Sequence, residues 1–452
     1  MSKTVKLKKG FDINLVGKAE KKIADLPLPE TFAIKPTDFP GIAQTKLNVK
    51  EGDSVKAGSP IMHDKAFENI IYASPVSGEV AEVVRGAKRK ILEIRILADK
   101  EISYENFKKY SQSDLDGISK EEATNQMTQS GVWPNIIQRP FGVVANPEDT
   151  PKAVFVSAFD THPLAPDMGF ILDGQSEYFQ AGLDILSKFA SVHLNLDGKA
   201  DNSDTFSSAK NVQINHISGA HPAGNVGVQI HHIDPINKGE IAWTVHPVGV
   251  VQIGKLFLEG KYDASKVISV TGSEIKDPQY YKTLTGSAVN KIVDELVNAG
   301  NVRLISGNVL TGEQINSTGY LGFYSNQLTA IPEGDYYEMF GWILPTTKKL
   351  SFHRAFGLLS FLNPNKEYAL DTNTRGQERA FVQTGTFEKV TPMDILPTFL
   401  LKAIMAEDYD EMEALGIYEV IEEDLALCEF VDVSKHDVQA IVRQGLDLIK
   451  NS

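Results

Sequence analysis

Several features that mark particular classes of protein are missing from this sequence. Its 452 residues contain one cysteine, Cys428. A single thiol excludes an intrachain disulfide and an iron–sulfur cluster held by this chain's own cysteines. The most apolar stretch, residues 241–258, is interrupted by His246, Gln252 and Lys255, which are too polar for a membrane span. The first ten residues also lack the apolar region of a signal peptide, so we expect a soluble cytoplasmic protein.

Positive charge is in deficit. The chain has 45 lysines and arginines against 59 aspartates and glutamates, which gives a net charge of −14. Such a chain is repelled by phosphate backbones and by anionic lipid. The balance therefore argues against sequence-independent nucleic-acid binding and against a polybasic membrane anchor. A small basic patch is still compatible with it.

The pattern of apolar residues changes along the chain. A typical size of about 150 residues per domain suggests about three domains. Residues 1–100 show short apolar runs between frequent turns, which predicts a small all-β module. From residue 153 onward, apolar strand-like runs alternate with helical spacing, which predicts a parallel α/β layer. The expected strands of this layer are 153–159, 192–196, 212–217 and 241–245.

The remainder of the chain is predicted to be mixed and then helical. A helix lying on a small mixed sheet is expected first, and two longer helices follow near the C-terminus. Ser434 is the expected N-cap of the last helix, with Asp437 three residues on as in a capping box. The expected elements are strands at 266–272, 302–305 and 319–323 and helices at 289–298, 393–405 and 438–449.

Residues 47–80 carry the most informative local pattern. Their turns and strands, which end in Pro75-Val76-Ser77-Gly78, resemble the barrel-sandwich fold of biotinyl and lipoyl carriers. In carriers a lysine on an exposed hairpin holds the cofactor, and Lys65 lies near that place. Its neighbours and its distance from Gly78 do not match the carrier motif, so we expect an unmodified structural module. A carrier protein with a modified lysine is kept as an alternative.

The α/β layer lacks the fingerprint of a dinucleotide site, which needs glycines directly after a buried strand. The expected strand 153–159 is followed by Asp160-Thr161-His162-Pro163 without a glycine, and Gly224-Asn225-Val226-Gly227 lies outside that context. This predicts a Rossmann-like domain without a nucleotide site. Asp160, His162 and Asp167 still lie where an open sheet places its crevice, so they are pocket candidates. The alternative is a rigid loop braced by prolines.

Histidines are concentrated in one part of the sequence, but they do not show the spacing of a metal site. We assign the adjacent pair His231-His232 to a strand, where the two rings would point to opposite faces. No carboxylate lies at a metalloenzyme spacing from them. Hydrogen-bonded histidines that line a cleft at strand ends are expected instead. The histidines concerned are His216, His221, His231, His232 and His246.

Longer stretches distributed along the chain give a more specific signal. They are Lys9–Ile13, Ile34–Gly41, Pro75–Gly78, His221–Gly224, His231–Pro235, Val270–Gly272, Pro392–Thr398 and Glu423–Val431. Together they resemble, over nearly the full length, the NqrA family of the bacterial sodium-translocating NADH:quinone oxidoreductase. That family is related to the RnfC subunit of a similar redox pump and to the flavin subunit of respiratory complex I.

The resemblance implies a multidomain chain of α/β and α+β class. It also implies a peripheral subunit on the cytoplasmic face of the cell membrane, docked on integral membrane subunits. Such a subunit supports quinone reduction coupled to sodium export and has no redox cofactor of its own. The implied parts are a barrel-sandwich module (1–100), a Rossmann-like domain (101–260), a β-grasp soluble-ligand-binding (SLBB-like) domain (261–330) and a mixed, then helical C-terminal domain (331–452).

The sequence departs from the flavin and cysteine motifs of the related subunits, and these departures argue against a cofactor in this chain. The stretch Gly131–Phe141 keeps Arg139 and Pro140 of a flavin loop but not its glycine-rich part, and bulky side chains there deny the backbone close approach to flavin. Asp432 stands where a second cysteine would follow Cys428. We therefore expect no flavin, NADH, cluster or metal site and no catalytic residue in this chain, which is expected to be inactive alone. NADH, quinone, sodium, flavins and iron–sulfur centres are implied for the complex.

Two alternatives to this function stay open, an autonomous flavin- or NAD-dependent dehydrogenase and the carrier protein described above. If the chain touches quinone or a neighbouring subunit, residues 31–41 and 131–141 are the candidate surfaces. Aromatic rings can stack on a quinone and an arginine can donate to its carbonyl oxygen, but the same residue types are enriched at subunit interfaces. The predicted contact residues are Phe32, Phe39, Trp133, Arg139 and Phe141.

Overall fold

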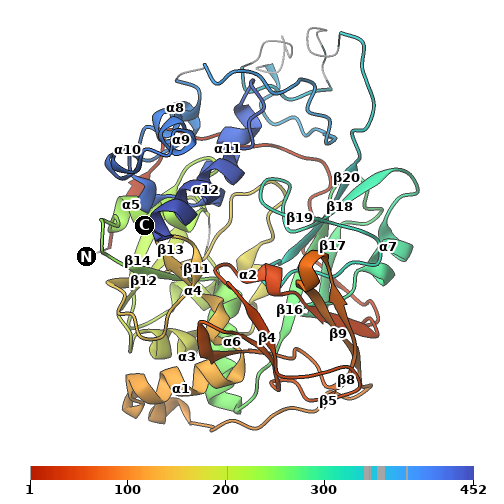
Figure 1. Cartoon of the computed structure of the whole chain (residues 1–452), viewed down its shortest axis with the longest axis vertical. Helices are drawn as coiled ribbons and strands as arrows, with labels where there is room; N and C mark the ends of the chain where they lie inside the picture. The colour runs from red at the N-terminus through yellow and green to blue at the C-terminus, as the bar shows by residue number, and fades with distance from the viewer. Residues whose placement is uncertain are drawn as a thin grey trace.

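The computed structural model describes residues 2–200, 202–340, 346, 348–353, 362–382 and 385–451. Within these residues the chain forms four β-sheets and a group of helices near the C-terminus (Figure 1). Two small sheets come from the N-terminal part, one seven-stranded sheet belongs to an α/β layer, and one sheet has six strands. This arrangement agrees with the predicted α/β and α+β multidomain class.

The N-terminal part is the predicted barrel sandwich. Its two sheets have the strand orders β3-β9-β8-β5 and β4-β6-β7. Ile61, Val80 and Ile96 are fully buried between the sheets, because alternate side chains of each strand face the same core. The strands are β3 (Thr31–Ile34), β4 (Thr45–Leu47), β5 (Ser54–Val55), β6 (Pro60–Asp64), β7 (Phe67–Ala73), β8 (Gly78–Arg85) and β9 (Ile91–Ala98).

The seven-stranded sheet has the order β1-β14-β13-β12-β15-β10-β11. The chain runs from β12 outward to β13 and β14 and then returns to the other side of β12 for β15, which is also parallel to it. The carboxyl ends of β12 and β15 therefore mark a switch point, where open α/β sheets place their crevices. The strands are β10 (Ile136–Arg139), β11 (Val143–Val144), β12 (Ala153–Ser157), β13 (Ser191–Asp197), β14 (Gln213–Ser218) and β15 (Ala242–Val245).

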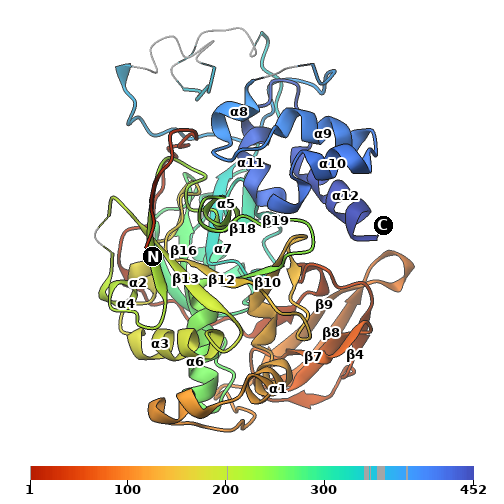
Figure 2. The same ribbon diagram turned by 90° about the vertical axis from the view of Figure 1, so that its left-hand side faces the viewer.

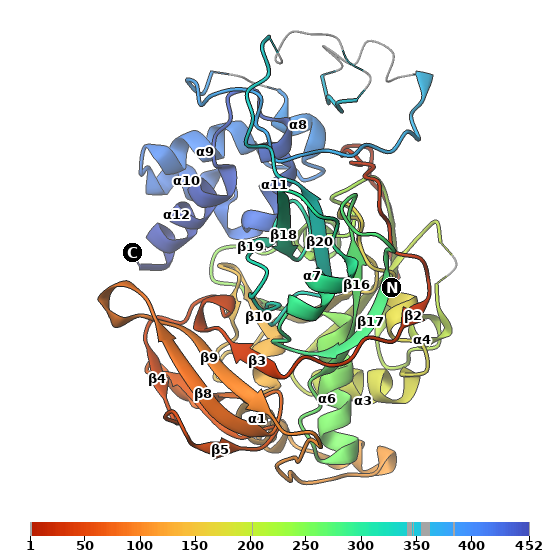
Figure 3. The same ribbon diagram turned by 90° about the vertical axis from the view of Figure 1, so that its right-hand side faces the viewer.

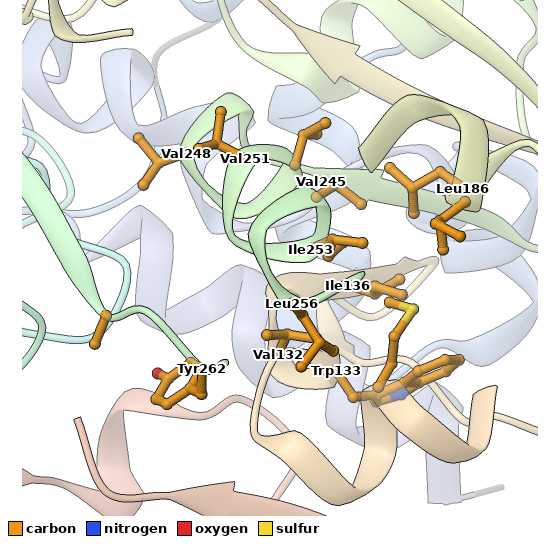
Figure 4. Close-up of a cluster of buried hydrophobic side chains, with 14 of the residues drawn as sticks. Val132, Trp133, Ile136, Leu186, Val245, Val248, Val251, Ile253, Leu256 and Tyr262 are labelled. Carbon is orange, nitrogen blue, oxygen red and sulfur yellow. The ribbon is translucent and has the colours of Figure 1, made fainter. Parts of the chain in front are cut away.

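Helices cover both faces of this sheet. Helices α3 and α6 pack against each other on one face, and α5 lies on the other face together with the C-terminal helices (Figure 2). The core under α6 is built on Trp133, Ile136 and Val245 from the sheet side and on Ile253 and Leu256 from the helix (Figure 4). The helices are α1 (Lys120–Ser130), α2 (Met168–Ile171), α3 (Ser176–Leu186), α4 (Asp204–Ser207), α5 (Val226–Ile233) and α6 (Pro247–Glu259).

Replacing Gly254 of α6 by alanine is expected to destabilise the protein by about 2 kcal/mol, as for other overpacked cores. A Cβ atom at this position would lie 1.8 Å from the carbonyl oxygen of Tyr178 in α3, so one helix must move. The matched control is Gly117→Ala, because Gly117 is exposed and has no atom within 4 Å of its Cβ position. Urea unfolding, monitored by circular dichroism, measures the stability of both variants. Equal stabilities would show that α3 and α6 are not in tight contact.

The six-stranded sheet has the order β19-β18-β20-β16-β17-β2 and carries helix α7. The predicted strand 319–323 is wrong: its backbone donors go elsewhere, Leu321 N to the Ser287 carbonyl and Phe323 N to the Asp38 carboxylate. The elements are β16 (Ser265–Thr271), β17 (Gln279–Leu284), α7 (Asn290–Leu296), β18 (Val302–Ser306), β19 (Glu313–Ile315) and β20 (Gln327–Pro332).

The first residues of the chain tie these parts together. β1 (Thr4–Lys6) pairs in parallel with β14 of the seven-stranded sheet, and β2 (Ile23–Ala24) pairs in parallel with β17 of the six-stranded sheet. Neither strand contributes to the barrel sandwich. Strands of two or three residues leave no periodic signal in a sequence, so this connection was not expected.

The C-terminal helices enclose a separate core around Leu400, Ile404 and Leu446. Helix α9 begins only at Pro397, where proline fits the first turn. The predicted cap of α12 is wrong, because Asp437 and not Ser434 accepts the Ala440 N–H. The helices are α8 (Phe387–Val390), α9 (Pro397–Met405), α10 (Tyr409–Ala414), α11 (Glu422–Val431) and α12 (Val438–Asn451).

Candidate functional site

The loop that follows β12 brings two of the predicted pocket residues together. Asp160 Oδ1 accepts hydrogen bonds from His162 Nδ1 at 2.6 Å and from the His162 backbone N–H at 2.8 Å. The two side chains are 26% and 11% exposed, so the pair lies at the edge of the core. The third candidate, Asp167, lies elsewhere: it caps α2 and pairs with Lys21 at 2.6 Å. The switch point therefore holds an Asp–His pair and not a group of three.

A second histidine reaches this pair from the loop after β14. The His221 ring centroid lies 4.7 Å from that of His162, and His221 Nδ1 lies 3.1 Å from Thr161 Oγ1. Thr161 Oγ1 also accepts the Gly224 N–H at 2.9 Å. A Cβ on Gly224 would lie 2.6 Å from Thr161 N, so the glycine lets the two loops meet. Its role here is close packing of two strand-end loops.

The C-terminal helices close the site with a buried ion cluster. Arg139, from the end of β10, is almost fully buried and donates to Asp424 at 2.7 Å and to Glu423 at 2.5 Å. Both carboxylates belong to the first turn of α11. The Asp424 carboxylate lies against α5, because a Cβ on Gly227 would come within 2.4 Å of it. The cluster therefore joins the α/β layer to the helical part.

Burial and neighbouring charges shift the pKa values of Asp160, His162 and His221 in different directions. Burial would raise the pKa of Asp160, but the charge and hydrogen bonds of His162 outweigh it and hold the pKa below its ordinary value. Burial opposes the charge on His162, but Asp160 prevails and raises its pKa. Burial and then the neighbouring His162 charge lower the pKa of His221 to about 3. At neutral pH the site thus holds an ionised Asp160 and a neutral His221, and the Asp160 carboxylate favours the protonated form of His162.

Five buried polar atoms of this site have no hydrogen-bond partner among the residues that the structure describes: His162 Nε2, His221 Nε2, Arg139 Nε, Asn225 Oδ1 and Asp424 Oδ1. Buried polar groups of this kind are normally satisfied by water or by a ligand. The arrangement can hold a proton and orient small polar molecules. No group of three or more metal-binding side chains occurs among the described residues.

Comparison with known proteins gives a consistent result along the chain. Residues 5–99 match the NqrA N-terminal barrel-sandwich hybrid domain, residues 118–262 the NqrA second alpha/beta domain, and residues 267–317 the NQRA C-terminal domain. The NqrA subunit of the Na(+)-translocating NADH-quinone reductase of Neisseria meningitidis serogroup A is 36% identical over 448 residues, which cover 99% of each chain. The NqrA subunit of the Alcanivorax borkumensis enzyme is 37% identical over 454 residues with the same coverage. The chain belongs to the NqrA family.

A chain of an NAD+-reducing [NiFe]-hydrogenase in the air-oxidized state covers 77% of this NqrA chain and 67% of its own length, with a TM-score of 0.38 and 12% identity. At this level the likeness carries no argument about function. Among the described residues, no helix is both long and apolar enough to cross a membrane.

The contact residues predicted for quinone or a neighbouring subunit do not form one site. Phe32 is buried inside the barrel sandwich. Trp133 is fully buried against Trp243, with its Nε1–H donated to the Ala145 carbonyl. Arg139 is held by the α11 carboxylates, as described above. Phe141 is partly exposed and contacts Tyr418 of the helical part.

Phe39, another predicted residue, lines a small cavity. Its ring packs 4.5 Å from Tyr72 and 4.8 Å from Phe323, measured between centroids. The cavity also touches Gly131 and Pro134 of the second predicted surface, so it brings residues 31–41 and 131–141 together. Its volume is about 10 Å³, the room of a single water molecule. A quinone ring needs more space than this, so binding there would require the aromatic side chains to move.

The interpretation of His231 and His232 as strand residues is wrong. Both lie in helix α5, with ring planes at 88° to each other. His231 Nδ1 contacts Glu419 at 2.6 Å, and His232 Nε2 contacts the Pro392 carbonyl oxygen at 2.7 Å. These histidines join α5 to the helical part of the NqrA chain. They thus act as structural hydrogen-bonding groups.

Cys428 and Asp432 are both buried in the helical part. Burial raises the pKa of the Cys428 thiol to about 12, and its sulfur lies 3.3 Å from Thr391 Oγ1. Asp432 accepts the backbone N–H groups of Ser434 and His436 and contacts His436 Nδ1 at 2.9 Å. Asp432 therefore holds the turn between α11 and α12, and Cys428 packs inside the helical part against Thr391.

Cys428→Ala is expected to leave the turnover of the assembled enzyme nearly unchanged, because a thiol with a raised pKa is a poor nucleophile. The expected loss of stability is about 1 kcal/mol, the scale of one small buried group. The measurements are quinone reduction by the purified complex and urea unfolding of the isolated chain. Loss of most activity with normal assembly would show that the thiol takes part in the reaction.

Proposed function

We propose that this chain is the peripheral, cytoplasmic NqrA component of a sodium-translocating NADH:quinone reductase, without a redox cofactor of its own. The observation that carries the proposal is the full-length similarity to NqrA subunits of such enzymes. In this function the chain supports quinone reduction coupled to sodium export. The partners that we infer are the other subunits, including integral membrane ones, which carry the flavins and iron–sulfur centres.

The structure supports a structural role better than an autonomous dehydrogenase. The loop after β12 has no glycine, and the Gly224 backbone N–H is donated to Thr161. This leaves neither the short turn nor the exposed backbone that a dinucleotide phosphate uses at a helix N-terminus. The stretch 131–141 is largely buried within the chain. Flavin and NADH therefore lack an evident place at the two positions where this fold would hold them.

Affinity purification of the tagged chain from its native membrane tests the proposal. We expect integral membrane subunits to be recovered with it and the chain to be released when the membrane is washed with alkaline carbonate. Calorimetric titration of the isolated chain with FMN and NADH should give no dissociation constant below about 10 μM, which corresponds to roughly −7 kcal/mol. Recovery without partners, together with tight flavin or NADH binding, would favour an autonomous dehydrogenase.

Contact of this chain with quinone at Phe32, Phe39, Trp133, Arg139 or Phe141 stays a prediction. The cavity beside Phe39 is the place where both predicted surfaces meet. A photoreactive quinone analogue added to the assembled complex tests it. Labelling within residues 31–41 or 131–141 that excess quinone suppresses would support a pocket. Labelling confined to the membrane subunits would leave Phe141, the partly exposed member, as a candidate for contact with a neighbouring subunit.

A further inference from the structure

The hairpin between β8 and β9 extends beyond the sheet to which it belongs. β8 and β9 pair from Gly78 and Ala98 out to Arg85 and Ile91. Their neighbours stop earlier: β5 pairs with β8 only at Glu79 and Gly78, and β3 pairs with β9 only from Leu97 to Ile94. The outer part of the hairpin is therefore a two-stranded ribbon, which projects from the side of the molecule (Figures 2 and 3).

The tip of this ribbon is strongly basic. Arg85, Lys88, Arg89 and Lys90 are all exposed, and residues 84–92 contain no carboxylate. None of the four cations forms an ion pair with the described part of the chain. The nearest carboxylates along the two strands belong to Glu82 and Glu93, and both are held by Arg95 at 2.7 and 2.8 Å. Four unpaired positive charges thus gather on a chain whose net charge is −14.

The backbone of the turn gives a second, independent observation. Lys88 and Arg89 have φ values of 54° and 62°, in the left-handed region that favours glycine or asparagine. A turn selected only for its shape would carry those residues. Here two successive left-handed positions carry long cationic side chains, at a cost in backbone strain. Strain of this kind is found where a side chain serves a function.

We propose that this basic tip, residues 85–90, binds the surface of a bilayer that contains anionic phospholipid. The four cations are exposed on a projecting turn, so they suit a flat surface with many headgroups better than one discrete anion. The exposed Leu92 beside it adds an apolar side chain. The inference rests on the proposed function, which places the chain beside a membrane.

The acidic remainder of the chain does not prevent such binding. At physiological ionic strength, charges are screened over about 8 Å, and the ribbon holds its cations away from the other surfaces (Figure 3). Repulsion of the acidic surfaces would instead favour one orientation, with the tip toward the lipid. A basic segment near an anionic bilayer gains roughly fivefold in partitioning for each cation. Four cations give a weak anchor that adds to contacts with partner subunits.

The test is co-sedimentation of the full-length chain with vesicles of phosphatidylcholine, either alone or mixed with phosphatidylglycerol. We expect binding only to the mixed vesicles, and binding should weaken as salt is added. Replacing Arg85, Lys88, Arg89 and Lys90 together by glutamine should reduce partitioning about 600-fold. The matched control replaces four exposed lysines elsewhere, Lys22, Lys199, Lys210 and Lys282, by glutamine and should reduce it less than about fivefold.

Several outcomes would overturn the proposal. One is equal binding of the native chain to neutral and anionic vesicles, and another is an equal loss in the two glutamine variants. Thermal unfolding and gel filtration show whether each variant is folded. Co-purification with the membrane subunits is measured separately and reports on the proposed function. A hairpin variant that binds vesicles normally but fails to assemble would show that the tip contacts an acidic protein surface, which overturns the lipid proposal alone.

Discussion

Replacing Arg139 by methionine is expected to destabilise the protein by about 3–5 kcal/mol, the usual result of breaking a buried ion pair by removing one partner. Asp424 is fully buried, and without the guanidinium it keeps only the Ile421 N–H as a partner for Oδ2. Methionine has a similar length but supplies no charge. We therefore expect the C-terminal helices to unfold in an early transition. Urea denaturation and amide hydrogen exchange in α11 measure it.

The matched control is Arg443→Met. Arg443 also joins the helical part to the α/β layer, through its hydrogen bond to the Phe141 carbonyl, and it pairs with Glu422 within the helical part, but it is 28% exposed. Partly exposed pairs of this kind contribute about 1 kcal/mol or less. A double variant, Arg139→Met with Asp424→Leu, should recover part of the loss because no charge is left buried. If Arg139→Met were as stable as the control variant, the cluster would not hold the two parts together.

The strands β12 and β15 of the α/β layer could be predicted because each is a short, largely apolar run that is buried. The strands β13 and β14 mix apolar and polar residues, and their short apolar segments were still sufficient. The segment 319–323 looks similar in sequence, but its donors are satisfied by Ser287 and Asp38 from distant elements. The assignment of His231-His232 to a strand missed a local signal. Val226, Ile230 and Ile233 recur at helical spacing, which indicates helix α5. The error at residues 319–323 depends on tertiary structure. The error at His231-His232 came from misreading the spacing of the apolar residues.

The candidate site was only partly predictable for a similar reason. The Asp160–His162 pair was predicted because it directly follows a buried strand. His221 belongs to the same edge, since parallel strands end on one side of a sheet, but the sequence does not say that two loops meet at Gly224. Arg139 and Asp424 are 285 residues apart in sequence. No spacing rule connects residues so distant, so the ion cluster emerged only from the fold.

Acid is expected to destabilise the protein through His221. Its pKa falls from about 6.5 in the unfolded chain to about 3 in the folded one. Below about pH 6.5 the unfolded state binds a proton that the native state does not, so stability falls with pH. Between about pH 7.5 and about pH 4.5 the free energy of unfolding falls by the equivalent of two pKa units, or about 3 kcal/mol. His221→Gln, whose amide can still bond Thr161, should remove about this much of the acid-induced loss in urea unfolding.

His162→Gln should change the pH dependence in the opposite direction, which makes it the discriminating control. The pKa of His162 is raised by Asp160, so its pair is fully favourable below about pH 6.5 and is lost as the pH rises through the folded value. Removing His162 takes away stability below about pH 6.5, so the stability of the variant falls more steeply with acid. Asp160, whose pKa is held low, contributes above about pH 4 and is constant in this window. If His221→Gln lost as much stability as the native chain between the two pH values, another group would control acid unfolding.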